Sequence, residues 1–261
     1  MNIRPAAVAG MFYPGDPKTL AHDVHALLSH TETPSLHPKA MIAPHAGYIY
    51  SGPVAASAYA LLTPYADQIR RVVLLGPTHR VAVRGLALPG ADAFDTPLGR
   101  VEIDLQAVRM IAGLPQVTVS PEAHQLEHSL EVHLPFLQTV LHNFKLLPLA
   151  VGMAGDRDVA EVLETLWGGP ETLIVVSSDL SHYHDYDTAR QIDSVTAQTI
   201  LRGTAVTHDQ ACGDTPVNGL ILAAKRHGLT PHLLDLRNSG DTAGDPSRVV
   251  GYAAFAYTEF P

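Results

Sequence analysis

The chain has 261 residues, of which 46% are hydrophobic and 16% charged, and its formal net charge is -9. This size and composition predict a single globular domain over residues 1–261. The negative charge argues against nucleic acid as a partner, and no apolar run is long enough for a membrane. One cysteine excludes a disulfide framework, and the N-terminus lacks the apolar core of a signal peptide, so a cytoplasmic protein is expected.

Apolar runs of strand length alternate with segments of helical periodicity along the chain. This alternation is typical of an α/β layered sandwich, and we predict a central mixed sheet flanked by helices. No composition break or fixed-period repeat divides the chain. The predicted strands cover 39–43, 71–75, 85–88, 101–103, 145–151, 173–176, 232–236 and 249–257, and the predicted helices cover 18–29, 53–62, 105–112, 123–142, 158–167, 189–202 and 217–226.

Prolines and glycines refine these boundaries. Their density in residues 1–20 predicts a loop. Pro53 is expected in the first turn of its helix, where a missing N–H costs nothing. The stretch 123–142 has leucines at helical spacing, and Pro135 within it predicts a kink or two abutting helices.

Three buried strands are each followed by a polar cluster that contains a histidine: His45, His79 and His182. If the strands are parallel, their ends share one edge of the sheet and the histidines converge there. Neutral imidazoles on rigid strand ends are good ligands for a divalent transition metal. The candidates for a third ligand are Cys212, Asp179, Glu127 and Asp241. A single histidine of this kind is more often a hydrogen-bonded structural residue, and a single cysteine is more often a small buried hydrophobe.

Motifs of several other enzyme classes are absent from the sequence. No Gly-x-Gly-x-x-Gly follows a strand, and no Walker A lysine motif occurs. No Gly-x-Ser-x-Gly elbow is present, which argues against a serine hydrolase of that type. Cys212 could serve a thiol enzyme, but no specific signature surrounds it.

Several motifs in order along the chain resemble those of the Memo family. The bacterial and archaeal members of that family are known as AmmeMemoRadiSam system protein B, and this name implies association with Ammecr1-like and radical SAM proteins. The resemblance extends from the N-terminal Ala-Val-Ala-Gly-Met-Phe-Tyr-Pro run to Val250-Gly251-Tyr252. Between them it rests on Ala43-Pro44-His45-Ala46-Gly47-Tyr48, Gly76-Pro77-Thr78-His79, Thr96-Pro97-Leu98-Gly99, the Glu-His-Ser-Leu-Glu-Val-His-Leu-Pro run at 127–135, Ser177-Ser178-Asp179-Leu180-Ser181-His182 and Ala211-Cys212-Gly213.

The family's fold is similar to that of class III, LigB-type, non-haem iron extradiol dioxygenases. This resemblance implies that His45, His79 and Cys212 bind a metal, with His182 as the acid/base and Asp179 in the same pocket. Cys212 stands where the dioxygenases have a carboxylate. The family resemblance makes iron the expected metal, and because a thiolate is a softer ligand it favours copper or zinc as well. The pocket is expected to include Tyr48, Glu127, His128 and Asp241.

Three functions follow as hypotheses. The first is a redox enzyme or oxygenase with mononuclear non-haem iron or copper, in which His182 moves protons and Asp179 orients an imidazole. The second is a non-catalytic module that binds an unknown small molecule, peptide or partner protein in the same pocket. The third is a zinc-dependent hydrolase in which Glu127 or His182 is the base. Metal identity separates the third from the first, and turnover separates the second from both.

Overall fold

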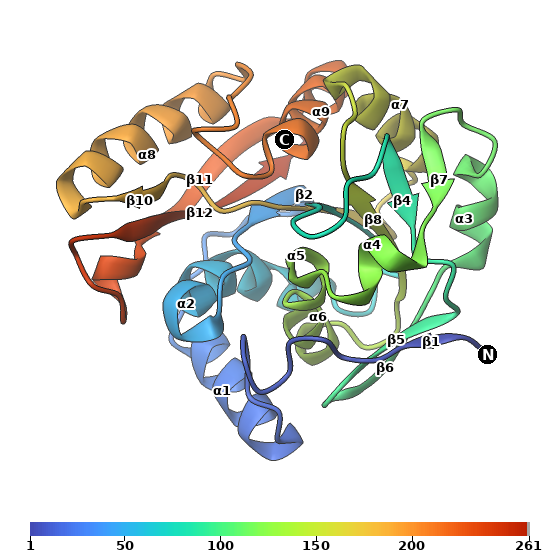
Figure 1. Ribbon diagram of the computed structural model, residues 1–261, viewed down its shortest axis with the longest axis horizontal. Coiled ribbons are helices and arrows are strands. Elements are labelled where there is room, and N and C mark those ends of the chain that lie inside the picture. The colour runs from blue at the N-terminus through green and yellow to red at the C-terminus, as the bar shows by residue number, and fades with distance from the viewer. Residues whose placement is uncertain (260–261) are drawn as a thin grey trace.

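A computed structural model describes residues 1–259 of the chain and has three layers, with helices on both faces of a central sheet (Figure 1). The nine-stranded sheet has the order β10-β12-β2-β9-β3-β8-β4-β7, and β11 pairs with β12 beyond this path. Its strands are β2 (Pro38–Ala43), β3 (Arg71–Pro77), β4 (Leu86–Leu88), β7 (Val117–Val119), β8 (Lys145–Val151), β9 (Thr172–Ser177), β10 (His182–His184), β11 (Thr230–Asn238) and β12 (Val249–Thr258).

The sheet is mixed, as the sequence predicts. Its centre is parallel, because β2, β9, β3 and β8 run in the same direction as neighbours. On either side, β12 is antiparallel to β2 and β4 is antiparallel to β8. A small separate sheet consists of β1 (Ile3–Arg4), β5 (Ala93–Thr96) and β6 (Gly99–Glu102). The parallel centre therefore brings the ends of β2, β9 and β3 to one edge.

The helices divide between the two faces of the sheet. In Figure 1, α1, α2, α5 and α6 lie below the sheet and α7, α8 and α9 lie above it. The helix α3 lies at the right beside β7, and its Ala107 and Ile111 pack into the same core as α7 and α9. Their bounds are α1 (Pro17–Ser29), α2 (Tyr48–Tyr59), α3 (Leu105–Ile111), α4 (Pro121–Gln125), α5 (His128–Glu131), α6 (Leu134–Val140), α7 (Asp156–Leu166), α8 (Tyr186–Leu201) and α9 (Asp214–Arg226), with 3-10 turns η1 (Ala60–Tyr65) and η2 (Ser239–Asp241).

Alternate residues of the central strands enter two separate hydrophobic cores. Met41 and Ala43 of β2 pack into the core below the sheet, whereas Ala40 and Ile42 pack into the core above it. Successive side chains of a strand point to opposite faces, so both faces of a central strand must be apolar. Burial of each large apolar side chain contributes about 1.5–3 kcal/mol to the free energy of unfolding.

The stretch 123–142 is interrupted, as Pro135 predicts, and α5 and α6 abut one another there, but a further break makes three short helices in all. It forms the end of α4, then α5 and α6, three short helices separated near residues 126–127 and 132–133. The carboxylate of Glu127 explains one break, because it accepts the N–H groups of His128 and Ser129 and so begins a new helix. Pro135 lies in the first turn of α6 and causes no kink. Leu134 and Leu137 are buried in the lower core, so the apolar stripe faces inward as predicted.

Two further boundaries differ from the predictions. The helix expected at 53–62 begins at Tyr48, so Pro53 lies inside it and not in its first turn. It begins early because the Tyr48 N–H donates to the Phe12 carbonyl, 2.8 Å away, an acceptor 36 positions earlier in the chain. Within the predicted N-terminal loop, Ile3 and Arg4 form a short strand that pairs with β5.

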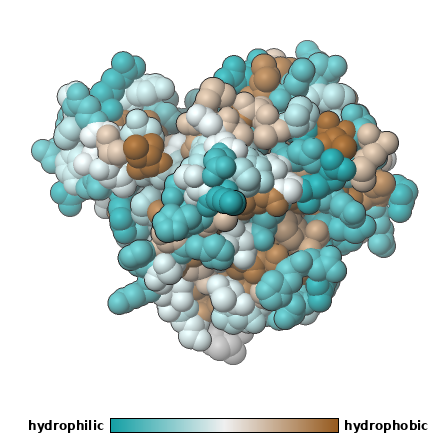
Figure 2. Space-filling model, turned by 90° about the horizontal axis from the view of Figure 1, so that it is seen from below, coloured by the Kyte–Doolittle hydropathy of each residue, from teal (hydrophilic) through white to brown (hydrophobic). Residues whose placement is uncertain are grey.

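The surface of the molecule mixes hydrophobic and hydrophilic residues. Seen from below the view of Figure 1, the hydrophobic residues form several separate patches between hydrophilic ones (Figure 2). Within residues 1–259, no helix has the length and apolar character needed to cross a membrane.

Candidate metal centre

Histidines gather at the edge of the sheet where β2, β9 and β3 end. His45 follows the end of β2 by two residues, and His79 follows the end of β3 by two residues. Their rings form an edge-on pair with centroids 5.1 Å apart. The prediction that these parallel strands deliver their polar clusters to one edge is therefore confirmed.

A third histidine completes a group with metal-ligand spacing. Within residues 1–259, His45, His79 and His128 each offer a ring nitrogen, and these ligand atoms all lie within 4.8 Å of one another. His128 is the first residue of α5, and its ring stacks on that of His79 with centroids 4.6 Å apart. The sequence placed His128 in the pocket but not among the ligands.

Hydrogen bonds orient the His45 imidazole. The Ser177 hydroxyl, 2.6 Å from His45 Nδ1, donates its proton to the Ser129 carbonyl, also at 2.6 Å. Because that hydroxyl has one proton, His45 Nδ1–H must donate to it, and Nε2 is left with a free lone pair. Burial, with the neighbouring histidines as a further cause, holds the pKa of His45 well below its usual value, so the ring is neutral. A neutral imidazole with a free Nε2 is the form that binds a metal.

Glu127 orients His79 as Ser177 orients His45, with Nδ1 hydrogen-bonded. Its carboxylate accepts the His79 ring at Nδ1, 2.8 Å away, and the His79 backbone N–H at 2.6 Å. Burial acts to raise the pKa of Glu127, but the hydrogen bonds and charge of His79 outweigh it and lower the pKa to about 2. The carboxylate is thus ionised, and it fixes the His79 tautomer with Nε2 free. Burial also lowers the pKa of His128 to about 4, so this ring too is neutral.

Cys212 lies beside this group, next to His45. Its Sγ is 3.4 Å from His45 Nε2, but Cys212 is not a member of the group within 4.8 Å. Burial, followed by the charge of Asp179, raises the pKa of the thiol to about 12, so it keeps its proton without a metal. Nitrogen and sulfur ligands of one tetrahedral zinc ion lie about 3.6 Å apart. The His45–Cys212 separation is therefore compatible with both side chains on one ion.

Asp179 and His182 lie on a cavity of about 400 Å³ that His128 also lines. Asp179 accepts the His45 backbone N–H at 2.7 Å, and burial raises its pKa to about 7. His182 Nδ1 lies 2.8 Å from the Leu180 carbonyl, which can only accept, so Nε2 again is free. Burial lowers the pKa of His182, which favours the neutral ring.

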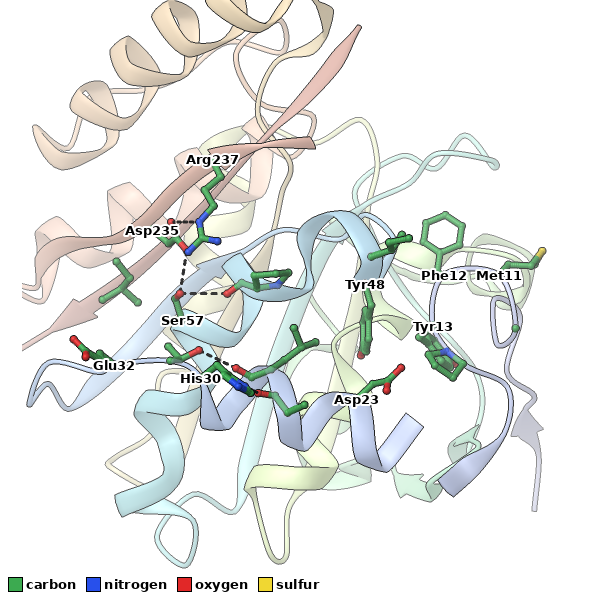
Figure 3. Close-up of a pocket in the computed structure, with 18 residues that line it drawn as sticks. Met11, Phe12, Tyr13, Asp23, His30, Glu32, Tyr48, Ser57, Asp235 and Arg237 are labelled. Carbon is green, nitrogen blue, oxygen red and sulfur yellow. Dashed lines mark hydrogen bonds and ion pairs between the residues drawn. The ribbon is translucent and has the colours of Figure 1, made fainter. Parts of the chain in front are cut away.

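The structure does not bring Tyr48 or Asp241 into this group. The Tyr48 hydroxyl donates to the Val132 carbonyl, and its ring lines a different and larger cavity of about 960 Å³ between α1, α2 and β11 (Figure 3). At one end of that cavity, Ser57, Asp235 and Arg237 are linked to one another. Asp241 is exposed in η2, where it accepts the Tyr186 hydroxyl.

Sequence reasoning did not assign a role to Ser177 or Ser129, which together set the tautomer of His45. A signal for Ser177 exists, because it is the last residue of β9 and pairs with Ala43 in the neighbouring strand. A polar residue at the end of a buried parallel strand faces the same edge as the candidate ligands. No local signal marks Ser129, whose carbonyl reaches Ser177 only in the folded chain.

The fold and this edge define a three-layer α/β protein with a candidate metal centre of three histidines. The family model described as "Memo-like protein" matches residues 4–256, so the chain belongs to the Memo family. It is 37% identical to MEMO1 family proteins from Aquifex aeolicus, with 98% of this chain and all of that protein covered, and from Methanothermobacter thermautotrophicus, with 96% and 99% covered. It is 33% identical to one from Metallosphaera sedula, with 99% and 100% covered.

A solved structure gives a weaker likeness. The crystal structure of the uncharacterized protein JW3007 from Escherichia coli K12 matches with a TM-score of 0.49 and 13% identity, covering 82% of this chain and 98% of that one.

Proposed function

We propose that this protein is a metal-dependent oxidoreductase with one metal ion held by His45 and His79 and a third protein ligand. The observation that carries the proposal is the convergence of imidazoles whose Nδ1 atoms are already occupied. The Nδ1 atoms of His45 and His79 are bonded to Ser177 and Glu127, so each ring presents Nε2 to the same place. Three protein ligands leave coordination positions open, which a catalytic site requires and a structural site lacks.

Two residues compete for the third position, and the softness of the metal decides between them. His128 belongs to the group within 4.8 Å and is neutral, so it suits iron(II) and other borderline metals. Cys212 must lose a proton to bind, and its pKa near 12 opposes this unless the metal has a strong preference for sulfur. Copper(I) has that preference. We therefore assign His128 to iron(II) and Cys212 to copper(I).

The polar residues around the centre would manage protons and orientation. A redox metal bound there would supply Lewis acidity and one-electron chemistry. His182, with Nδ1 donating to Leu180, offers Nε2 as a base toward a substrate in the cavity it shares with His128. Asp179 has a pKa of about 7 and lies against His45, so it can take up or release a proton near neutral pH. Ser177 and Glu127 hold the two imidazoles in position.

A zinc hydrolase is a second candidate, because three histidines with an open fourth position also form a zinc site. In that case the metal lowers the pKa of a bound water, and His182 or Glu127 would act as the base. Glu127 is poorly suited to this role, because its carboxylate already accepts bonds from His79, His128 and Ser129. The metal itself separates the two candidates.

The first experiment is elemental analysis of untagged protein purified anaerobically without added metal. We expect iron as the main bound metal. Titrations with iron(II) and copper(I) then follow for the wild type and for four variants. His45→Ala and His79→Ala should each lower the affinity for both metals at least tenfold. His128→Ala should mainly lower the affinity for iron(II), and Cys212→Ser should mainly lower the affinity for copper(I). The control is His142→Ala, because His142 pairs with Asp67 on the surface away from the group.

The proposal would be contradicted if every variant bound iron(II) and copper(I) with the same affinities as the wild type. Zinc at one equivalent, with no iron or copper, would favour the hydrolase. Association with Ammecr1-like and radical SAM proteins remains a prediction from the family resemblance, and co-purification from the native organism would test it.

A further inference from the structure

The cavity beside the histidines has a second wall that the proposed chemistry does not use. Besides His128 and His182, the segment that precedes and begins β12 lines the cavity of about 400 Å³, and Val250 of that segment pairs with His182. Arg248 belongs to this segment, and the aromatic residues Phe12, Tyr50, Tyr183 and Tyr252 contribute further lining. The volume and the aromatic lining suit a ligand with a single ring or a body of similar size.

Arg248 has uncommitted hydrogen-bond donors. Within residues 1–259, its guanidinium makes no ion pair and no side-chain hydrogen bond, whereas Arg4, Arg71 and Arg237 each bind a carboxylate. The guanidinium lies 4.3 Å from the centroid of the Tyr183 ring, over its face. A guanidinium stacked in this way keeps its N–H donors in the plane of the group, free for a carboxylate or phosphonate.

Tyr183 has a strained backbone. Its φ of 66° makes it the one non-glycine residue with a positive φ in the described part of the chain. Its ring is 63% exposed, so burial of the ring does not explain the strain. A bulky residue in this region is strained, and such strain concentrates at functional sites. Here it follows His182 directly and places an aromatic face under Arg248.

The other charged groups of the cavity leave Arg248 available. The carboxylate of Asp245 accepts the Ser247 N–H at 2.8 Å, and no Asp245–Arg248 ion pair forms. Asp179 accepts the His45 backbone N–H. Arg248 is the one arginine or lysine that lines the cavity. The positive charge of Arg248 and the imidazoles of His128 and His182 therefore line the same cavity.

We propose that Arg248 binds the anionic end of a small, flat substrate, a carboxylate or phosphonate-like oxyanion on a ring, and directs the other end toward His182 and His128. The reactive end rests on the proposed function, but the anchoring does not require the metal. Tyr183 holds the guanidinium in position and, with Tyr50, presents aromatic surface to the ring. The substrate class is thus an aromatic or similarly flat acid.

The test measures binding of four probes to metal-free protein by NMR of the histidine imidazoles. The probes are benzoate, phenylphosphonate, neutral benzyl alcohol and inorganic phosphate. We expect one of the two aromatic anions to bind and to shift the His182 signals, with at least tenfold weaker binding in Arg248→Gln and a smaller loss in Arg248→Lys. Benzoate as the tighter ligand identifies a carboxylate substrate, and phenylphosphonate as the tighter ligand identifies a phosphorus oxyanion.

A matched control is available on α8. The Arg190 guanidinium lies 5.8 Å from the centroid of the Tyr186 ring, and Arg190 does not line the cavity. Arg190→Gln removes the same charge from a similar pair and should leave the affinities unchanged. Equal affinity of Arg248→Gln and wild type for both aromatic anions, or no binding of either, would overturn the inference. So would binding of benzyl alcohol as tight as that of the anions.

The inference and the proposed function fail in different ways. Iron(II) binding by Arg248→Gln should equal that of the wild type, because Arg248 is no candidate ligand. Metal binding without charge-dependent binding of the aromatic anions would overturn the anchor and leave the metal centre. Charge-dependent anion binding by a protein that takes up no metal would overturn the metal centre and leave the anchor.

Discussion

Two buried glutamates at the two ends of α5 bind different kinds of side chain: an arginine in one case and a histidine in the other. Glu127 is 2% exposed and Glu131 is 0% exposed, and they lie four residues apart. Glu131 binds the Arg4 guanidinium at 2.5 Å, the Tyr13 hydroxyl at 2.6 Å and the N–H groups of Ala7 and Val8. Glu127 binds His79 through both its ring and its backbone.

The contrast shows that the partner of a buried carboxylate decides its role. A guanidinium stays charged and has no lone pair to offer a ligand. Arg4 donates to the Glu131 carboxylate and to the carbonyls of His124 and Glu127, so it ties the N-terminal segment to α4 and α5. An imidazole has two nitrogens, so a carboxylate that holds one of them directs the other toward a ligand. Residue type and burial alone do not separate these cases.

The largest expected effect comes from breaking the Arg4–Glu131 pair. Glu131→Gln should lower the free energy of unfolding by about 3–5 kcal/mol, because it leaves the Arg4 guanidinium buried without a counter-charge. Urea unfolding of the metal-free protein measures this. Glu122→Gln, on the exposed surface of α4, is the control and should stay within about 0.5 kcal/mol of wild type. A Glu131→Gln protein as stable as the control would show that the pair contributes no stability.

Glu127→Gln should act mainly on the metal. The amide can no longer accept at both oxygens, so His79 loses part of its orientation and iron(II) affinity should fall about 10–100-fold. Titration under anaerobic conditions measures this, with Glu131→Gln as the comparison at a temperature where it is folded. If both variants lost metal affinity equally, the division of roles between the two glutamates would be wrong.

A smaller effect concerns Asp193, a buried carboxylate that forms no ion pair with an arginine or a histidine among the described residues. It accepts the Ser181 N–H at 3.0 Å, and burial raises its pKa to about 6. Between pH 4 and 6 the native carboxyl holds a proton that the unfolded chain has released, so rising pH lowers its contribution to stability. Asp193→Asn has no such titration.

The stability of Asp193→Asn relative to wild type should therefore increase by roughly 1–2 kcal/mol as the pH rises from 4 to 6. Urea midpoints at four pH values measure it. A difference that does not change with pH would mean that Asp193 is ionised in the native protein at pH 4.

The sequence predicts the sheet and its functional edge well because both depend on local patterns. Buried strands need apolar residues on both faces, and the polar clusters after residues 43, 75 and 176 stand out against them. The site is harder to predict, because its hydrogen bonds join distant segments. Nothing local indicates that Glu127 reaches His79, 48 positions earlier, or that Tyr48 bonds to Val132 and faces another cavity.

The number and positions of the breaks in the stretch 123–142 were not predicted, for a related reason. Helical periodicity of its leucines is real, and Leu134 and Leu137 are buried together. The breaks come from polar contacts that periodicity does not register, chiefly the Glu127 carboxylate that caps α5. Glu127 accepts local N–H groups of His128 and Ser129 and also binds the distant His79, and these bonds outweighed the intrinsic helical preference of the stretch.

The most direct test of the metal centre is anomalous X-ray diffraction from crystals of protein loaded anaerobically with iron(II). The account predicts one strong anomalous peak at the iron edge, about 2.0–2.2 Å from Nε2 of both His45 and His79 and bonded to His128 as the third protein ligand. Stoichiometric iron at any other place, or crystals in which these imidazoles bond only to protein groups, would contradict it.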